Sequence, residues 1–356
     1  MFHRILVINP GSTSTKVGVY INEQPLCVST IRHTVEELMQ YEQIIDQHDF
    51  RQQLVIDWLK ANDIPFEFDA IIGRGGLIKP IPGGVYRVNR KMVYETYYAL
   101  RKHACNLGCI IAYELAKQQQ NGCKAYIADP VTVDELLPEA RVSGSPLMPR
   151  LAIWHALNQR AIARRYASEK GSQYEDLNLI ICHLGGGISI AAHQKGRAVD
   201  ANNALDGEGP LSPERAGTLP AADLIHLCYS GRYTEDQLKK RVAGQAGLMA
   251  HLGTTDILQI MQQVEAGDAH AKLLIDAMIF HTAKAIAAEG AVFSGQVDAI
   301  LITGGMAHSK YITQGIASRV KFIAPVHLFP GEDEMEALAL NALSVLRGEC
   351  VAKEYE

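Results

Sequence analysis

The chain lacks the short motifs that identify several common enzyme classes. No lysine is followed by serine or threonine, so the Walker A phosphate loop is absent. Neither a G-x-S-x-G nucleophile elbow nor an H-E-x-x-H zinc motif occurs. The seven cysteines are scattered without a C-x-x-C pair, which favours buried free thiols in a reducing cytoplasm over disulfides or a zinc site.

The chain also lacks a basic excess and an uninterrupted apolar run. Its 34 basic and 39 acidic residues give a net charge of -5, so we expect no nucleic-acid partner. The most apolar stretch, 273–292, contains Asp276, His281, Lys284 and Glu289, which predicts a core helix rather than a membrane span. The N-terminus enters a predicted strand directly, which argues against a signal peptide. We therefore expect a cytoplasmic protein without a membrane partner.

The length and the order of predicted elements indicate two α/β domains. A chain of 356 residues exceeds one small core. Strands that alternate with helices predict mostly parallel central sheets. The segment 138–149 is rich in proline, glycine and serine and is predicted to link the halves. We therefore expect an N-terminal domain over 1–147 plus 336–356, and a C-terminal domain over 148–335.

Two similar turns, one in each half, favour phosphate binding. The first follows the apolar run 5–8 and reads Asn9-Pro10-Gly11-Ser12-Thr13-Ser14-Thr15-Lys16. Glycine allows close backbone approach, hydroxyls donate hydrogen bonds and lysine adds charge, although an ordinary polar turn has a similar composition. The second turn reads His183-Leu184-Gly185-Gly186-Gly187 between the apolar runs 179–182 and 188–192. The repetition predicts two similar halves that clamp a nucleotide.

Other polar candidates also follow predicted strands. Asn9 and Asp129 each come directly after an apolar run, Arg74 follows the run 70–72 after one glycine, and Thr303-Gly304-Gly305 follows the run 299–302. Ligands of open α/β sheets bind outside the carboxyl ends of the strands. We therefore expect these residues to line a common site.

The candidate residues suit a carboxylate acceptor better than a sugar. A sugar hydroxyl would need an aspartate base, whereas a carboxylate, with a pKa of about 4.3, is already ionised. It needs cations to offset the repulsion between two anions and to stabilise the transferring phosphoryl group. Arg74 and Arg215 lie in segments fixed by glycine or proline and are candidates for this role. A structural role on a loop is the alternative for both.

Together these motifs resemble the acetokinase family of the sugar kinase/Hsp70/actin superfamily. The first turn, the second turn, the segment 212–220 and Thr303-Gly304-Gly305 follow one another in the family's order, and the likeness covers essentially the whole chain. Segments 143–146, 153–159 and 206–210 are most similar to the butyrate kinase branch. The resemblance implies a duplicated, ribonuclease H-like α/β fold with a central nucleotide cleft. It also implies in-line phosphoryl transfer from ATP to butyrate, with Mg²⁺, giving ADP and butyryl phosphate.

The resemblance further implies a role for each matching residue. The first phosphate loop would contain Asn9, Ser12, Ser14 and Lys16, the second would contain Gly185, Gly186 and Gly187, and the adenosine side would contain Gly304 and Gly305. Arg74 and Arg215 would flank the acid and the phosphoryl group, to which His155 would donate. Metal ligands would be Asn9, Asp129 and Glu334, with Glu332 and Asp333 as alternatives to Glu334.

The resemblance also bears on the acid and on assembly. Family members with a smaller acid carry a branched side chain where this chain has Gly76, so we expect Gly76 to open space for extra methylenes, with His103 nearby. Propionate or a branched acid such as isobutyrate or isovalerate is the alternative substrate. We expect a homodimer or larger homo-oligomer, with contacts in the second domain.

Two other classes within the superfamily stay open at this point. A sugar kinase is disfavoured because Asn9 cannot act as a base and no aspartate base is evident. A nucleotide-driven module of the Hsp70 or actin type would need sequence for partner binding, and almost none remains after Leu346. Acyl phosphate formation separates the proposed reaction from both.

Overall fold

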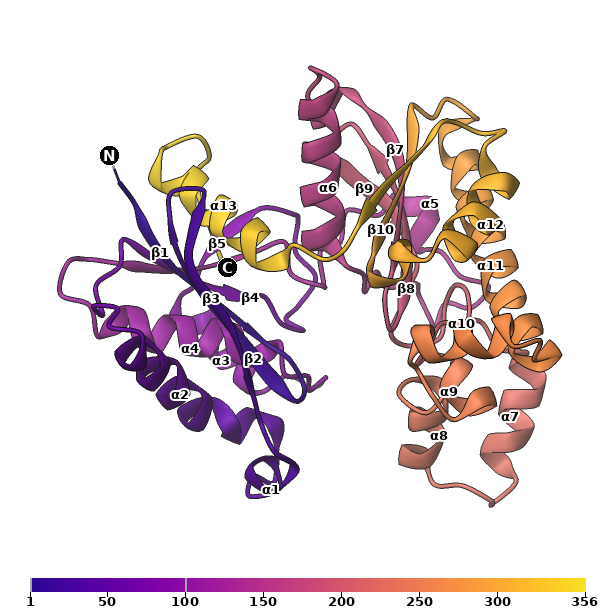
Figure 1. Cartoon of the computed structure of the whole chain (residues 1–356), viewed down its shortest axis with the longest axis horizontal. Helices are drawn as coiled ribbons and strands as arrows, with labels where there is room; N and C mark the ends of the chain where they lie inside the picture. Colours follow the sequence, from indigo (N-terminus) through magenta and orange to yellow (C-terminus); the bar gives the residue numbers. More distant parts are fainter. Residues whose placement is uncertain (1, 100) are drawn as a thin grey trace. The chain divides into compact units, whose positions relative to one another are not determined.

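The computed structural model describes residues 2–99 and 101–356, which form two compact units (Figure 1). Unit 1 runs from the N-terminus to Val133 and resumes at Asp333, whereas unit 2 comprises Asp134–Glu332. Each unit contains one sheet with helices on both faces. The α/β fold class predicted from the sequence is therefore confirmed.

Both boundaries differ from the expected breaks after 147 and 335. Leu137 donates its N–H to the Val199 carbonyl at 2.8 Å, and Arg150 donates to the Ala140 carbonyl at 2.8 Å. These bonds attach residues 134–147 to unit 2. Glu334, in contrast, contacts the side chains of Asn9 and Arg74 in unit 1. These contacts attach the start of α13 (Glu334–Leu346) to unit 1.

The sheet of unit 1 has the strand order β12-β5-β6-β4-β1-β2-β3. Three strands form an antiparallel meander, and β4 and β6 continue the sheet parallel to β1. The strands are β1 (Arg4–Pro10), β2 (Ser14–Ile21), β3 (Gln24–Arg32), β4 (Ala70–Arg74), β5 (Val85–Arg87), β6 (Lys124–Ala128) and β12 (Lys353–Glu354). The sequence did not predict β3, because Leu26 and Val28 are exposed and obscure its alternation.

Helices cover both faces of this sheet (Figure 1). One face packs against α13 (Glu334–Leu346), and the other against α2 (His48–Ala61), α3 (Arg90–Tyr97) and α4 (Asn106–Lys117). The apolar spacing of residues 54–59 predicts one helix over 34–60, but the structure has α1 (Val35–Leu38), a 3₁₀ turn η1 (Ile44–Gln47) and α2 there. The sequence Asn106-Leu107-Gly108 predicts a break between two helices, and in the structure α4 begins at these residues.

A glycine pair explains why α4 can start there. A Cβ on Gly73 of β4 would lie 2.0 Å from the Gly108 carbonyl oxygen, and a Cβ on Gly108 would lie 2.5 Å from the Arg74 carbonyl oxygen. Both distances are impossible for larger residues without displacement. The absence of side chains therefore lets α4 pack directly on the strand that carries Arg74.

The sheet of unit 2 repeats the pattern of unit 1. Its order is β11-β10-β7-β8-β9, with β7–β8–β9 antiparallel and β10 and β11 parallel to β7. In unit 1, the strands β6-β4-β1-β2-β3 have the same order of parallel and antiparallel neighbours. The strands are β7 (Asn178–Leu184), β8 (Ile188–Gln194), β9 (Arg197–Ala201), β10 (Ala299–Gly304) and β11 (Val326–Pro330). The duplication inferred from the turns thus extends to the topology.

Long helices cover the two faces of the second sheet (Figure 1). One face packs against α6 (Ala156–Glu169), and the other against α11 (Ala269–Glu289) and α12 (Lys310–Val320). The remaining helices are α5 (Pro138–Arg141), α7 (Ala221–Tyr229), α8 (Glu235–Val242), α9 (Gly247–Leu252) and α10 (Ile257–Glu265). The apolar spacing predicts a helix from 151, but α6 begins at Ala156, so His155 precedes the helix as its N-cap residue.

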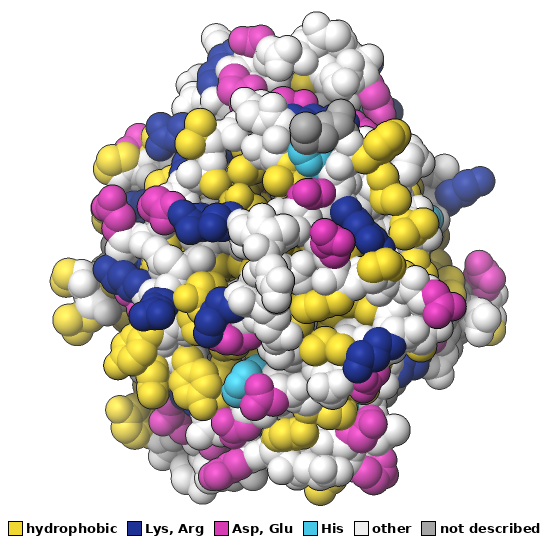
Figure 2. Space-filling view, turned by 90° about the vertical axis from the view of Figure 1, so that its left-hand side faces the viewer, with side chains coloured by type: hydrophobic (Ala, Val, Ile, Leu, Met, Phe, Trp, Pro, Cys, Tyr) yellow, Lys and Arg dark blue, Asp and Glu magenta, His cyan; other side chains and the backbone are white. Residues whose placement is uncertain are grey.

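On the face shown in Figure 2, lysine and arginine side chains are interspersed with acidic and apolar ones. This mixture is typical of a solvated protein surface. Within the described part of the chain, no helix combines the length and apolarity needed to span a bilayer.

Candidate active site

The first turn connects β1 to β2 in unit 1 and is closed by its own backbone. Gly11 donates its N–H to the Ser14 carbonyl at 2.7 Å. Asn9 and Lys16 lie opposite one another in the β1–β2 ladder, so their side chains share one face of the sheet. Ser12 and Lys16 are exposed, and Ser14 is half-buried. The turn therefore brings together donors that suit an anion.

Arg51 of α2 holds this turn from the protein interior. Its fully buried guanidinium donates to the carbonyls of Gly11 at 2.7 Å, Ser14 at 3.0 Å and Ser12 at 3.1 Å. It also donates to Gln47 Oε1. Burial lowers the pKa of Arg51 to about 10, so the group remains charged at neutral pH. A buried cation thus lies behind the turn, and the carbonyls that face it are directed inward.

Glu334 brings together two of the predicted site residues. Its carboxylate forms an ion pair with Arg74 Nη1 at 2.9 Å and accepts a hydrogen bond from Asn9 Nδ2 at 2.8 Å. Arg74 ends β4, Asn9 lies near the end of β1, and Glu334 begins α13. The Arg74 side chain is only 6% exposed. The structure therefore fixes an arginine at the carboxyl end of the sheet.

Asp129 follows β6 in a conformation that is uncommon for a residue with a side chain. Its φ is 39°, which lies in the left-handed region that aspartate tolerates better than most residues. The residue is fully buried, and its Oδ1 accepts the Gly84 N–H at 2.7 Å. Arg74 and Ala128 are partners in the β4–β6 ladder, so Asp129 lies one residue past the strand end that neighbours Arg74.

Asn106 lies directly beside Gly76. A Cβ on Gly76 would lie 2.5 Å from Asn106 Oδ1 and 2.6 Å from Asn106 Cα. That oxygen also accepts the Leu77 N–H at 2.8 Å. A side chain at position 76 would therefore displace Asn106.

His103 is exposed and lies between α3 and α4. Its Nδ1 lies 3.1 Å from Cys105 Sγ. The charges of Arg74 and Glu334 act on the Cys105 thiol, although burial is the main cause that raises its pKa to about 11. Cys105, two residues after His103, is thus close to Arg74.

The second turn packs tightly against the segment that carries Arg215. A Cβ on Gly187 would lie 1.9 Å from Arg215 Nη1, and one on Gly186 would lie 3.1 Å from the Glu214 carboxylate. Arg215 donates to the Ala204 carbonyl at 2.6 Å. Burial lowers the pKa of Arg215 from its usual value. Glycine is therefore required at 187, because the guanidinium occupies the space of a side chain.

His155 lies beside the same turn. Its ring stacks on His183 with centroids 3.8 Å apart and planes 11° from parallel, and its Nδ1 lies 2.8 Å from Ser189 Oγ. His183 Nε2 lies 2.9 Å from Glu332 Oε1. Glu332 is thus associated with unit 2, whereas Glu334 is associated with Asn9 and Arg74 of unit 1.

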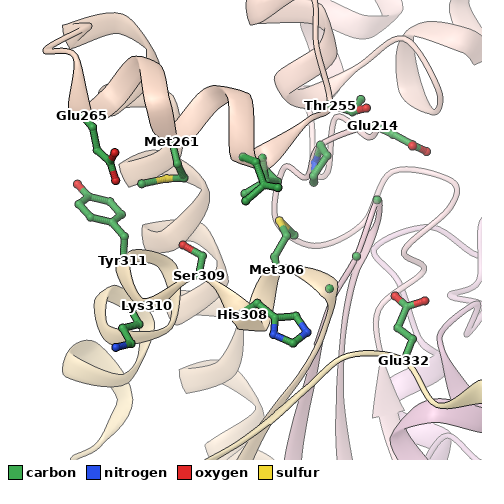
Figure 3. A pocket seen from close by; sticks show the side chains of 16 residues that line it. Glu214, Thr255, Met261, Glu265, Met306, His308, Ser309, Lys310, Tyr311 and Glu332 are labelled. Atoms are coloured by element: carbon green, nitrogen blue, oxygen red, sulfur yellow. The ribbon is translucent and has the colours of Figure 1, made fainter.

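A pocket of about 770 Å³ opens within unit 2 beside the second turn (Figure 3). Gly185 and Gly186 contribute to one part of it, together with Glu214 and Glu332. The other end contains Glu265, Met261 and Tyr311 (Figure 3). Apolar walls come from Ile257, Leu258, Met261 and Met306. A pocket of this size, with apolar walls and convergent polar groups, is typical of a small-molecule site.

A third turn, Thr303-Gly304-Gly305 at the end of β10, contributes to the same pocket. Gly305 lines it and has open space where a Cβ would stand. Gly304 has a φ of 93°, and its Cβ would lie 2.4 Å from the Leu184 carbonyl oxygen. Gly304 therefore allows β10 to approach the end of β7, which brings the second and third turns together.

Sequence reasoning missed several residues that shape these sites. Arg51 and Asn106 are buried polar residues far in sequence from the turns they contact, and the buried Ser189 contacts His155 from 34 residues away. Each of these residues interrupts an apolar helical or strand pattern, which could have marked it as unusual. The pattern does not show which residue each side chain contacts. The predicted site residues otherwise fall into two groups, one in each unit.

Comparison with known proteins gives a consistent result. A profile described as the acetokinase family matches residues 152–324. A relative from Bacteroides thetaiotaomicron named "Probable butyrate kinase" is 63% identical over 353 residues, covering 99% of this chain and 100% of the relative. "Butyrate kinase 2" from Clostridium acetobutylicum is 48% identical over 358 residues, covering 100% of both chains.

Solved structures agree on the fold. A crystal structure of Porphyromonas gingivalis acetate kinase matches with a TM-score of 0.78 at 16% identity, covering 97% of this chain and 100% of that chain. A propionate kinase from Francisella tularensis matches with a TM-score of 0.76 at 16% identity, covering 95% and 98%. At this identity the likeness shows the two-domain α/β fold alone.

Replacement of Arg51 should weaken the first turn. Arg51→Met leaves three turn carbonyls without their donor, and hydrogen bonds to charged groups contribute about 1.5–3 kcal/mol each. We expect the free energy of unfolding to fall by about 5 kcal/mol, near the lower end of the range for three bonds, and the affinity for ATP to fall about tenfold. Chemical denaturation and titration calorimetry measure the two quantities. Arg90→Met, at an exposed position of α3, is the matched control; equal behaviour of the two variants would contradict the assigned role.

Proposed function

The chain belongs to the acetokinase family, and from that premise we propose that it is a butyrate kinase. It transfers the terminal phosphoryl group of ATP to the carboxylate of butyrate, reversibly and in line, and gives butyryl phosphate and ADP. The observation that carries the proposal is the full-length identity of 48–63% with relatives named for this activity. We place the reaction in the cytoplasm.

Unit 1 supplies groups that suit a carboxylate acceptor. A carboxylate is ionised at neutral pH and needs no general base, but it needs a cation that remains in place. Arg74 is nearly buried and is held by Glu334, so little side-chain entropy is lost when it binds an anion. We assign Arg74 to the acid, and Arg215 of unit 2 to the phosphoryl group during transfer.

We assign the nucleotide to the pocket of unit 2. Its glycine turns suit phosphates because backbone N–H groups can approach an anion closely there. Its apolar walls suit a purine base. Gly185, Gly186 and Gly187 would contact phosphates, and Gly304 and Gly305 the adenosine side. Asn9, Ser12, Ser14 and Lys16 of unit 1 would form the other phosphate loop.

Asp129, Glu334 and Asn9 suit a magnesium ion that arrives with a nucleotide. Among the residues that the structure describes, no three histidine, cysteine, aspartate or glutamate side chains converge as a closed metal cage. Magnesium in phosphoryl-transfer enzymes usually takes only one or two carboxylates beside water and phosphates. When bound, the ion would neutralise charge on the phosphate oxygens. Asn9 and Arg74 fix the Glu334 carboxylate for this purpose.

We assign His155 as a hydrogen-bond donor to the transferring group. Stacking on His183 and contact with Ser189 fix its ring. A fixed donor at the position where charge develops stabilises the transition state without reorganisation.

The identity of the preferred acid rests on small free-energy differences. Each buried methylene contributes about 0.8 kcal/mol, which is roughly fourfold in affinity. Propionate and branched acids such as isobutyrate and isovalerate therefore remain the second candidate class. We assign Gly76, which has Asn106 beside it, to the pocket for the acid.

A trapping assay tests the reaction and the acid together. We expect the protein with MgATP to form acyl phosphate most efficiently from butyrate in a series of straight acids from acetate to hexanoate. The physical reason is that methylenes add binding energy until the cavity is filled. Hydroxylamine converts acyl phosphates to hydroxamates, which are read by colour. ADP release without hydroxamate would show that the acceptor is not a carboxylate.

The two arginines should affect turnover more than nucleotide binding. We expect Arg74→Ala and Arg215→Ala each to lower kcat at least a thousandfold, about 4 kcal/mol, because charge in the transition state loses a fixed cation. The affinity for ATP, measured by calorimetry, should change less than about threefold. Arg165→Ala removes an exposed guanidinium from α6 and serves as control. A parallel loss of ATP affinity and rate would assign the arginines to nucleotide binding instead.

We also propose that the chain forms a homodimer or larger homo-oligomer through unit 2. Helix α7 has no buried residue, although most of its side chains are apolar. Ile225 and Tyr229 are 58% and 89% exposed. Exposed apolar surface of this kind is typical of an interface.

Charged residues on α7 should therefore lower the assembly state. We expect Ile225→Asp with Tyr229→Asp to halve the sedimenting mass or more, because carboxylates would be buried without partners. Sedimentation velocity measures the change. Leu26→Asp with Val28→Asp on exposed positions of β3 is the control. A wild-type chain that sediments as a monomer would contradict the proposal.

A further inference from the structure

A continuous chain of hydrogen bonds leads from a buried tyrosine to His155. Tyr174 Oη lies 2.6 Å from His193 Nδ1, and His193 Nε2 lies 3.0 Å from Gln159 Oε1. Gln159 Nε2 lies 2.9 Å from Ser189 Oγ, which lies 2.8 Å from His155 Nδ1. We call Tyr174, His193, Gln159 and Ser189 the tyrosine–serine chain.

The tyrosine–serine chain lies between β8 and α6, away from solvent. Gln159, Ser189 and His193 have no exposed surface, and Tyr174 is 2% exposed. Buried polar groups of this kind pair donors with acceptors, since an unmatched group costs about 1–3 kcal/mol. The direction of each bond can therefore be worked out from the side-chain inventory.

The Ser189 carbonyl fixes the direction of the first two bonds. Gln159 Nε2 lies 3.2 Å from this carbonyl oxygen, which can only accept, so the amide nitrogen must face Ser189. Gln159 Oε1 then faces His193, whose Nε2 must donate. Burial, with the charges of Arg160 and Arg164, lowers the pKa of His193 well below its usual value, so the ring is neutral. Its Nδ1 accepts, and Tyr174 donates.

The contacts of the Ser189 hydroxyl determine which atom donates in its hydrogen bond with His155. It accepts from Gln159 Nε2 at 2.9 Å and from the His155 backbone N–H at 3.3 Å. A hydroxyl has two lone pairs and one proton. Both lone pairs are engaged, so the proton is donated to His155 Nδ1. The proton of a neutral His155 ring must then reside on Nε2.

We propose that the tyrosine–serine chain holds His155 as the neutral tautomer with its proton on Nε2, so that this nitrogen donates to the phosphoryl group. Ser189 and Gln159 are thus positioning residues for the reaction. A proton on Nδ1 would oblige Ser189 to accept a third hydrogen bond, so the chain disfavours both the other tautomer and the imidazolium. The catalytic consequence rests on the proposed function, whereas the tautomer itself does not.

Nitrogen NMR of the wild-type protein tests the tautomer without any need for activity. In protein labelled with ¹⁵N-histidine, at neutral pH, we expect the His155 Nδ1 resonance at the position of an unprotonated nitrogen and Nε2 at that of a protonated one. The spectrum of His155→Gln identifies the signals. A protonated Nδ1, in either the other tautomer or the imidazolium, would overturn the proposal.

Ser189 variants test the consequence for catalysis. Ser189→Ala removes the donor to Nδ1, so both tautomers should appear in the spectrum. We expect kcat to fall about ten- to hundredfold, the range typical when a partner that orients a functional histidine is lost, with KM for ATP nearly unchanged. Ser189→Thr retains the hydroxyl and should restore the wild-type spectrum and most of the rate.

A matched control separates positioning from packing. Thr282→Val removes another fully buried hydroxyl of unit 2, which donates to the Met278 carbonyl within α11, and should leave kcat and the His155 signals unchanged. A Ser189→Ala enzyme with wild-type tautomer and rate would refute the positioning role. A wild-type protein with the expected tautomer but no acyl phosphate would refute the proposed function alone.

Discussion

A single carboxylate ties together the predicted site residues of unit 1. Glu334 contacts Asn9 at the end of β1 and Arg74 at the end of β4, and it also begins α13. An acidic side chain in the first turn of a helix is favoured by the helix dipole. The position of the arginine therefore depends on a helix that belongs to the last part of the sequence.

Charge is compensated differently at Arg74 and at Arg51. Glu334 neutralises Arg74 in part, whereas Arg51 donates to uncharged oxygens of the first turn and of Gln47. A buried positive charge therefore lies behind the first turn, where burial protects it from solvent screening.

Sequence reasoning recovered the features that depend on local pattern. The strands that precede each turn and the duplication follow from apolar runs and glycine positions. It fell short where tertiary contacts decide the outcome. Asn106 lies beside Gly76 from thirty residues away, and His155 precedes α6 although the helical spacing begins at 151.

The polar residues behind the turns illustrate the same limit in another way. Ser189 and His193 alternate with apolar residues along β8 and resemble ordinary strand residues in the sequence. Their significance comes from Gln159, which a one-dimensional pattern cannot connect to them. Local sequence thus predicts where a site lies better than it predicts how the site is tuned.

The shared strand order of the two sheets has a consequence for protein engineering. The two halves share a strand order, but the residues around their turns differ. Arg51 donates hydrogen bonds to main-chain oxygens of the first turn, whereas Arg215 occupies the volume that a side chain at Gly187 would need. A substitution tolerated in one half is therefore no guide to its counterpart, and grafting a turn between halves would require its arginine to be moved as well.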